Sequence, residues 1–328
     1  MKVQHIIGTD ISKRSIDFFI HALNSYLKIE NSISGFNLLL GWLRQQNIKA
    51  STVMIVMEHT GLYSYHLEEF LHQHQISFIK VSALAIKRSL GLIRGKSDKI
   101  DAQRIARYGF EKRDMLIPQT RPDKSLQRLQ MLHSTRERLV RNKSAMTCAL
   151  KEYQAILKQE DLIIESHLKL IKELDEHIKA MDQQIKEIVT EQNAIKENFQ
   201  LLTSVKGVGK VLAVAAIVKT GNFTRFTKAR KFSCHSGTAP FEYSSGTSIR
   251  GKTRVSHLAD KEMKTLLDLA AKSAIQYDKE IRDYYLRRIE EGKSKRSTRN
   301  IIRNKILYRM FAVIKRRTPF VENYSRAA

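Results

Sequence analysis

Four acidic residues stand where predicted secondary structure elements begin or end. Asp10 closes a short apolar run that starts at His5, and Glu58 closes the run TVMIVM. Asp98 and Asp101 are three residues apart, so one face of a helix carries both. Carboxylates at the ends of adjacent strands, faced by a helix that carries two more, can converge on one point. The pattern therefore predicts a cluster of four carboxylates.

Such a cluster predicts a metal site, because converging carboxylates repel one another unless cations lie between them. Oxygen ligands select hard ions, which indicates Mg²⁺ or Mn²⁺. Two such ions, about 4 Å apart, would stabilise the attacking and leaving oxygens of a phosphoryl transfer. Each acid alone has an ordinary interpretation, for example Asp98 as a favourable charge at a helix N-terminus. His59, beside Glu58, is interpreted as a packing or solvent-facing residue.

A second candidate for chemistry is the polar segment from Pro240 to Arg254, PFEYSSGTSIRGKTR. Its composition predicts a flexible loop in which Arg250, Lys252 and Arg254 occupy alternate positions. A hydroxyl flanked by glycine and cations can attack a phosphodiester, with the cations stabilising the developing charge. From composition alone, an ordinary surface loop is the stronger interpretation.

A third candidate is the turn VKGVGK, which lies between two apolar segments. It resembles the hairpin of helix-hairpin-helix modules, whose glycines let backbone N–H groups approach a phosphate at a helix N-terminus. This interpretation makes Lys206, Gly207, Gly209 and Lys210 candidates for nucleic-acid binding. A structural turn between two helices uses the same residues, and both interpretations stay open.

The elements that must position the acids alternate between strand and helix. The predicted order is an antiparallel hairpin (His5–Gly8 and Ser15–Ala22), a helix (Ile33–Gln45), a strand (Thr52–Met57), a helix (Tyr63–His74), a strand (Ser77–Val81) and a helix capped by Ser97. This order predicts an α/β domain with a mixed sheet over residues 1–117.

The middle of the chain predicts a helical arm. Two of the four prolines fall between Leu116 and Asp123, which indicates a linker. Residues 124–199 contain neither Pro nor Gly, and the apolar residues from Ile171 to Ile188 alternate three and four apart. That spacing predicts an antiparallel helical hairpin or a coiled coil. Two ordinary helices packed on a domain are the alternative.

The last part of the chain, residues 201–328, predicts a second and mostly α-helical domain. Helical spacing covers Lys261–Ile275 and Ile301–Ile314, and the stretch from Gly292 to Arg303 is densely basic.

The net charge indicates a polyanionic partner. The chain holds 58 Lys and Arg against 33 Asp and Glu, a formal charge of +25. Such a field attracts nucleic acid or an anionic membrane surface. The longest apolar run, Val211 to Val218, falls far short of the ~20 residues that cross a bilayer, and the first residues lack a secretory signal. With only Cys148 and Cys234, neither a disulfide framework nor a zinc site is indicated. We expect a cytoplasmic protein that binds nucleic acid.

The acidic motifs resemble a known domain. TDIS with Asp10, MEHTG with Glu58 and KSDKIDA with Asp98 and Asp101 resemble the RuvC-like, RNase H-like DEDD domain of bridge-RNA-guided insertion-sequence transposases and the related Piv-type DNA invertases. SVKGVGK and the segment after it resemble the C-terminal transposase domain of the same family. There a serine precedes a glycine downstream of a proline, which corresponds to Ser245. The resemblance spans most of the chain in the same order.

The resemblance implies a mechanism and partners. The four acids would hold Mg²⁺, and Ser245 would attack DNA to form a covalent 5′-phosphoserine, which lets strands be exchanged and resealed without ATP. A structured bridge RNA would pair with donor and target DNA, a division of labour that suits a basic protein. The family works as a tetramer in which the RuvC-like domain of one protomer joins the serine domain of another. The location would be the bacterial cytoplasm, at the nucleoid.

The chain departs from the family pattern after the serine. The family has Ser-Lys-x-Gly and then an Arg on the following helix, whereas this chain keeps Ser256 and has His257, Ala259 and Lys264 at the other positions. These departures concern phosphate contacts rather than the catalytic serine.

Two other functions use the same features. A Holliday-junction-resolvase-type nuclease would use the four acids with water as nucleophile and would not need Ser245. A non-catalytic nucleic-acid-binding protein would not need the four acids, all of which are present. The sequence does not separate a transposase from a site-specific invertase that uses no guide RNA.

Overall fold

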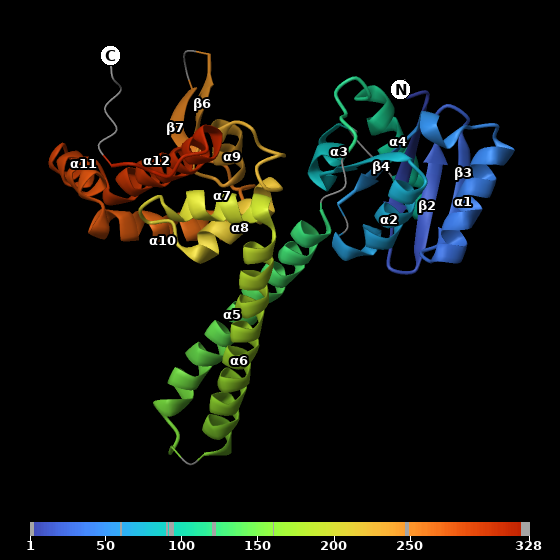
Figure 1. Ribbon diagram of the computed structural model, residues 1–328. Helices are drawn as coiled ribbons and strands as arrows, with labels where there is room; N and C mark the ends of the chain where they lie inside the picture. Colours follow the sequence, from blue (N-terminus) through green and yellow to red (C-terminus); the bar gives the residue numbers. More distant parts are fainter. Residues whose placement is uncertain are drawn as a thin grey trace. The chain divides into compact units, whose positions relative to one another are not determined.

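The computed structural model describes residues 3–59, 61–89, 91, 95–119, 123–159, 161–246 and 249–322. The chain divides into two compact units, Met1–Arg121 and Pro122–Ala328, and Figure 1 shows their helices and strands, labelled where there is room. Within the described ranges, no helix has both the length and the apolar character that a membrane crossing requires. The predicted division into three domains stays a prediction.

The first unit is built on a mixed five-stranded sheet. Its strands are β1 (His5–Ile11), β2 (Ser15–Ile20), β3 (Ser25–Glu30), β4 (Val53–Glu58) and β5 (Ser77–Val81), in the order β3-β2-β1-β4-β5. β1, β2 and β3 pair antiparallel, whereas β4 pairs parallel with both β1 and β5. The predicted α/β RNase H-like class is confirmed. The sequence prediction omitted β3.

Helices cover both faces of this sheet. They are α1 (Ile33–Gln45), α2 (Tyr65–Gln73), α3 (Ala83–Ser89) and α4 (Asp98–Glu111), with 3-10 turns at Ala50–Thr52 and Gly61–Ser64. One core contains Leu39 of α1 and Leu71 of α2 together with Ile55 of β4. A second core contains Ile105 of α4 together with Val56 of β4. Because strand side chains alternate between the two faces, α1 and α2 lie on one face and α4 on the other.

Helix α4 crosses β1 at Gly8. A Cβ added to Gly8 would lie 2.1 Å from the backbone N of Ala106 and 2.2 Å from the backbone O of Ala102. Only glycine leaves room for this approach of two backbones. The close crossing fixes the N-terminal end of α4 near the C-terminal end of β1.

We predict that Gly8→Ala lowers the unfolding free energy of this unit by about 3 kcal/mol, because the new methyl group overlaps backbone that cannot rotate away. The control is Gly41→Ala in α1, where an added Cβ has no neighbour within 4 Å. Removing a glycine from a helix interior should raise stability by about 0.5–1 kcal/mol. Chemical denaturation measures both, and equal effects of the two substitutions would contradict the close-crossing argument.

The second unit begins with a long helical hairpin, which we call the arm. It consists of α5 (Lys124–Gln154) and α6 (Leu162–Glu191), which run side by side in Figure 1. Arg136 Nε lies 2.6 Å from Asp182 Oδ1, and Lys143 Nζ lies 2.5 Å from Asp175 Oδ1. A later residue of α5 thus pairs with an earlier residue of α6, so the helices are antiparallel. The predicted helical arm is confirmed.

The apolar seam of α6 faces α5 within the same chain. Ile178 and Ile185 are buried, and Ile185 shares a core with Leu129 and Leu132 of α5. We predict that Ile178→Asp combined with Ile185→Asp separates the two helices, because two charges enter an apolar contact. The control is Lys179→Asp with Lys186→Asp, at exposed positions one residue further along. Helical circular dichroism on heating should show an early transition only in the seam variant; identical curves would contradict it.

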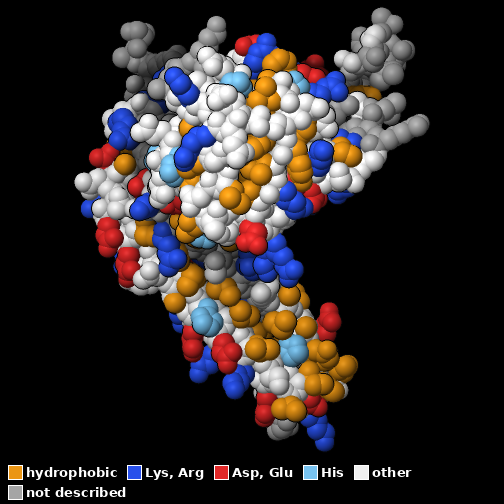
Figure 2. All heavy atoms as spheres, turned by 90° about the vertical axis from the view of Figure 1, so that its right-hand side faces the viewer, with side chains coloured by type: hydrophobic (Ala, Val, Ile, Leu, Met, Phe, Trp, Pro, Cys, Tyr) orange, Lys and Arg blue, Asp and Glu red, His pale blue; other side chains and the backbone are white. Residues whose placement is uncertain are grey.

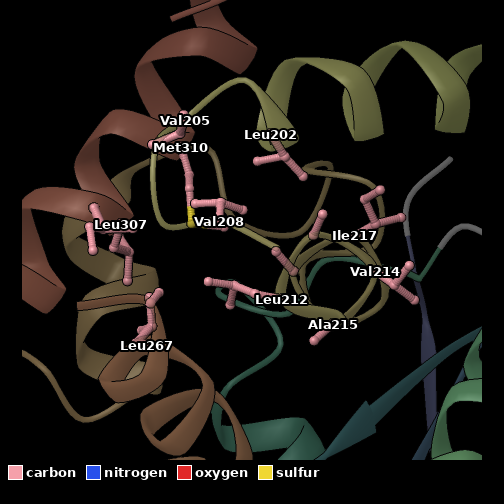
Figure 3. Packing of buried hydrophobic residues seen from close by; sticks show 14 of the residues in the cluster. Leu202, Val205, Val208, Leu212, Val214, Ala215, Ile217, Leu267, Leu307 and Met310 are labelled. Atoms are coloured by element: carbon pink, nitrogen blue, oxygen red, sulfur yellow. The ribbon is translucent and has the colours of Figure 1, made fainter. Parts of the chain in front are cut away.

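The rest of the second unit is a helical domain with one hairpin. The helices are α7 (Asn193–Thr203), α8 (Lys210–Thr220), α9 (Ala229–His235), α10 (Lys261–Tyr277), α11 (Lys279–Glu290) and α12 (Lys295–Arg316). α8 is almost wholly apolar, and its side chains pack with Leu267 of α10 and with Leu307 and Met310 of α12 (Figure 3). The helical C-terminal domain predicted from the sequence is confirmed.

The polar segment predicted as a loop forms an antiparallel hairpin instead. β6 (Pro240–Ser245) pairs with β7 (Ile249–Val255). The interpretation as a loop was wrong because it weighted Ser, Thr and Gly and overlooked the aromatic and β-branched residues that favour strands. Phe241 and Tyr243 lie in β6, and Val255 lies in β7.

Candidate active site

Asp10 and Glu58 lie at the carboxyl ends of neighbouring parallel strands. The last register pair of β1 and β4 joins Thr9 to Met57, so the two acids follow it directly. Gly8 faces α4, and side chains alternate along a strand, so Asp10 is also on the α4 side of the sheet. The same alternation from Val56, which packs with Ile105 of α4, places Glu58 on that side. Both carboxylates are partly exposed.

Asp98 and Asp101 occupy the first turn of α4, on the side of the sheet that carries the strand acids. Ser97 caps this helix as predicted, its Oγ accepting a hydrogen bond of 3.3 Å from the Ile100 N–H. A cation contacts each acid. Lys28 Nζ lies 3.3 Å from Asp98 Oδ2, and Arg104 Nη1 lies 3.0 Å from Asp101 Oδ1.

The pKa of Asp10 depends on the charges of the other three predicted acids. Burial and, after it, the charges of Asp101, Asp98, Asp17 and Glu58, in that order, together raise the pKa of Asp10 to about 6. Such repulsion acts only over short distances, so all these carboxylates lie near Asp10. The sequence-predicted acids are therefore brought to one end of the sheet.

The structure adds Asp17, which the sequence analysis missed. Asp17 of β2 is the register partner of Asp10 and is 2% exposed. The Tyr26 hydroxyl donates a hydrogen bond to it, and Lys28 Nζ lies 3.7 Å away. Burial and this hydrogen bond raise the pKa of Tyr26 to about 12. The available signal was a single carboxylate inside the otherwise apolar strand SIDFFI.

The donor set fits a hard cation, since it consists of carboxylate oxygens whose mutual repulsion a cation would relieve. Within the described ranges, however, no three His, Cys, Asp or Glu side chains are grouped closely enough to hold one ion. Lys28 and Arg104 bind Asp98 and Asp101 here. An ion shared by the four acids would have to displace these contacts.

Ser245 lies at the end of β6, next to the hairpin turn. Its backbone partner is Ile249, and Ser244 pairs with Arg250. Gly246, with φ of +55°, continues the chain into the turn. Among the neighbours, Ser244 and Arg254 are exposed. The side chains of Ser245, Arg250 and Lys252 lie outside the part of the structure that is described. The acids belong to the first unit and Ser245 to the second.

The glycine turn connects α7 to α8, and its two glycines have different surroundings. Gly207 has φ of +89°, and an added Cβ would lie 2.6 Å from the backbone O of Ala270 in α10, so packing alone requires glycine there. Gly209 precedes α8 in open space, with no atom within 4 Å of an added Cβ. Lys206 forms an ion pair with Glu322, and Lys210 is exposed. Gly209 and Lys210 are thus exposed to a ligand, whereas Lys206 and Gly207 are partly buried.

Comparison with family models gives two matches. A model of the DEDD domain of IS110 elements, described as a transposase, matches residues 7–159. A model described as "Transposase IS116/IS110/IS902 family" matches residues 199–286. Together they cover well over half of the 328 residues, in the order expected from the motifs. DEDD domains of this kind generally use divalent metal ions, in agreement with the donor set described above.

Individual relatives include DNA-rearranging proteins. The chain is 26% identical over 324 residues to the pilin gene-inverting protein of Moraxella bovis, covering 96% of this chain and 97% of that protein. The pilin gene-inverting protein of Moraxella lacunata gives the same identity and coverage. The transposase for insertion sequence element IS1328 of Yersinia enterocolitica is 26% identical over 203 residues, 55% of this chain and 59% of that protein.

Proposed function

Because the chain belongs to the IS110/IS116/IS902 family of transposases, we propose that it is an RNA-guided DNA recombinase of a mobile element. It cleaves and exchanges DNA strands through a covalent 5′-phosphoserine on Ser245, with a metal-binding DEDD site in the first unit. The observation that carries the proposal is the group of carboxylates around Asp10, in a chain whose second unit matches the transposase domain.

Asp10, Glu58, Asp98 and Asp101 are the residues that would hold divalent ions. Bound ions of this kind stabilise negative charge on the attacking and leaving oxygens of a phosphoryl transfer. Until an ion is bound, Lys28 and Arg104 keep Asp98 and Asp101 in place. Asp17 is nearly inaccessible and is held by Tyr26, so we assign it a positioning role beside Asp10.

Ser245 is the proposed nucleophile. Its hydroxyl oxygen attacks a phosphodiester phosphorus, forming a Ser–O–P bond while the bond from phosphorus to the 3′ oxygen breaks. The departing 3′ oxygen gains a proton, and the serine loses one. In the reverse step, the 3′ hydroxyl of another strand attacks the phosphoserine and releases the serine. Since phosphodiester and phosphoserine bonds are exchanged one for one, no ATP is needed. A protein–DNA adduct that survives denaturation tests this step.

The proposed partners are donor DNA, target DNA, a structured bridge RNA and further copies of this chain in a tetramer. The charge of +25 supports binding to nucleic acids. The far end of the arm supports an assembly, because apolar side chains gather there in Figure 2. The exposed ones include Ile156, Leu162, Ile163, Leu168 and Leu170. Apolar surface of this extent marks an interaction site more often than a solvated one.

Site-specific inversion without a guide RNA is the second candidate. It is favoured by the similarity to pilin gene-inverting proteins over 96% of this chain, against 55% for the IS1328 transposase. Expressing the chain together with its flanking DNA and sequencing the RNA that copurifies separates the two. A structured RNA from the flank, required for recombination between two plasmids, supports the guided reaction. Recombination by RNA-free protein supports inversion.

We predict that nucleic-acid affinity falls steeply with salt, because each phosphate neutralised by Lys or Arg releases counterions. Six contacted phosphates would lower the affinity for duplex DNA about a thousandfold between 50 and 200 mM salt. Fluorescence anisotropy measures the slope of the logarithm of affinity against the logarithm of salt concentration. An affinity that stays constant over this range of salt concentration would show that binding does not depend on charge.

A further inference from the structure

A pocket of about 460 Å³ opens where α10, α11 and α12 meet. These three helices pack on one another at the end of the helical domain (Figure 1). The lining residues are Lys272, Ile275 and Gln276 of α10, Tyr285 of α11, and Lys295 and Arg299 of α12. The pocket lies in the unit that carries Ser245, and no step proposed above uses it.

The pocket carries a positive charge that neighbouring acids do not cancel. Its lining holds three cations and no acid. Asp268, outside the lining, contacts two of these cations: its carboxylate oxygens lie 3.1 Å from Lys272 Nζ and 3.9 Å from Arg299 Nη1. Arg303 also binds Asp268, so one carboxylate serves three cations. The Arg299 Nε is buried and has no hydrogen-bond partner among the described residues.

The start of α12 strengthens this field. Lys295 stands in its first turn, which contains no acidic residue. Cations at a helix N-terminus are unfavourable beside the positive end of the helix dipole. An anion in the pocket would relieve the repulsion between Lys295 and the helix dipole. It would also relieve the repulsion among Lys272, Lys295 and Arg299.

One part of the lining is apolar and fixed. Ile275 and Tyr285 are partly buried and pack against the core of the helical domain. A tyrosine held in this way offers a ring surface at low entropic cost, and base–aromatic stacking contributes about 1–3 kcal/mol per base. Gln276 adds an amide that both donates and accepts hydrogen bonds.

We propose that this pocket binds one unpaired nucleotide of a nucleic-acid strand, with its phosphate at Lys272, Lys295 and Arg299 and its base against Tyr285. The volume suits a single nucleotide, since pockets for small ligands measure roughly 300–1,000 Å³. A base stacked inside a duplex cannot enter. The inference rests on the proposed function in one respect, namely that the chain handles nucleic acid.

The test measures binding of the full chain to a fluorescent single-stranded DNA, to single-stranded RNA of the same sequence and to duplex DNA. Lys295→Gln with Arg299→Gln should weaken single-strand binding about tenfold and reduce the salt slope by about 0.7, the value for one phosphate contact on a single strand. The matched control is Lys293→Gln with Arg296→Gln, which removes two cations of the same segment that do not line the pocket. It should weaken binding less than about threefold.

Tyr285 separates stacking from charge. Tyr285→Leu keeps an apolar side chain at this partly buried position, and it should weaken binding to single strands about tenfold while leaving duplex binding unchanged. Tyr285→Phe keeps the ring and should bind as the unsubstituted chain does. Thermal melting checks that each variant is folded. A tighter complex with RNA would identify a guide strand as the source of the nucleotide, and a tighter complex with DNA a displaced DNA strand.

Two outcomes would overturn the proposal that this pocket binds a nucleotide. Equal weakening by the two double variants would show that only net charge matters, and full single-strand affinity of Tyr285→Leu would exclude base stacking. In both cases the unsubstituted chain still binds nucleic acid, so the proposed function stands. If the unsubstituted chain binds none of the three probes, the proposed function fails with it.

Discussion

Asp10→Asn and Asp101→Ala are each expected to reduce DNA strand cleavage at least about a thousandfold. Metal ions contribute several kcal/mol to the stabilisation of a phosphoryl-transfer transition state, and each 1.4 kcal/mol corresponds to a factor of ten. The structure groups Asp10 with Asp98, Asp101 and Glu58 at one end of the sheet. Cleavage should require Mg²⁺ or Mn²⁺ and should stop when EDTA is added.

Stability measurements distinguish loss of the site from loss of the fold. Burial and neighbouring carboxylates raise the pKa of Asp10 to about 6 from its ordinary value of 3.8. The folded state therefore binds a proton that the unfolded state has released between these two values, so stability falls as the pH rises through this window. At neutral pH without metal, Asp10→Asn removes the repelling charge and should raise the melting temperature while cleavage is lost.

A control variant exists on the same helix. Glu111 stands at the other end of α4, where it accepts a hydrogen bond from Arg107. Glu111→Gln should leave cleavage unchanged, because this carboxylate is remote from Asp10. Full activity in EDTA, or equal losses in Glu111→Gln and Asp10→Asn, would contradict a metal site built on the four acids.

The sequence predicted the sheet of the first unit where its strands and helices carry many apolar residues. Val53–Met57 of the run TVMIVM is buried on both faces in β4, and α1 has the predicted bounds Ile33–Gln45. β3 was missed because it is an edge strand in which only Ile29 is buried. Two of its residues instead contact acids of the candidate site: Lys28 binds Asp98, and Tyr26 binds Asp17. Edge strands lack the hydrophobic signal that sequence reasoning uses.

Convergence of the acids could be predicted only in part. Strand ends and helix spacing were enough to group Asp10, Glu58, Asp98 and Asp101. The grouping of Asp17 with Asp10 depends on the register of β1 and β2, which a turn of a few residues sets and which composition does not reveal. The role of Gly207 likewise emerged only from its contact with Ala270, sixty-three residues later in the chain. The spacing of apolar residues along the chain does not predict contacts between elements that are remote in sequence.

Ser245→Ala is expected to abolish strand exchange and to eliminate every covalent protein–DNA product. A serine hydroxyl is a weak nucleophile that must be activated, but no other group can form the phosphoserine once its oxygen is removed. Nucleic-acid binding should stay within about threefold of the unsubstituted chain, because one hydroxyl contributes roughly 0.5 kcal/mol to an interface governed by charge. Binding and chemistry should thus separate in this variant.

Ser244→Ala is the matched control. Ser244 precedes Ser245 in β6, is exposed and pairs with Arg250 across the hairpin, so its substitution changes the same strand by the same atom. We expect it to retain exchange. The assay traps protein on labelled DNA under denaturing conditions and locates the modified residue by peptide mass. An adduct on Ser244, or cleavage by Ser245→Ala that leaves free ends and no adduct, would instead indicate a resolvase-type nuclease, in which the same carboxylates direct water to the phosphodiester.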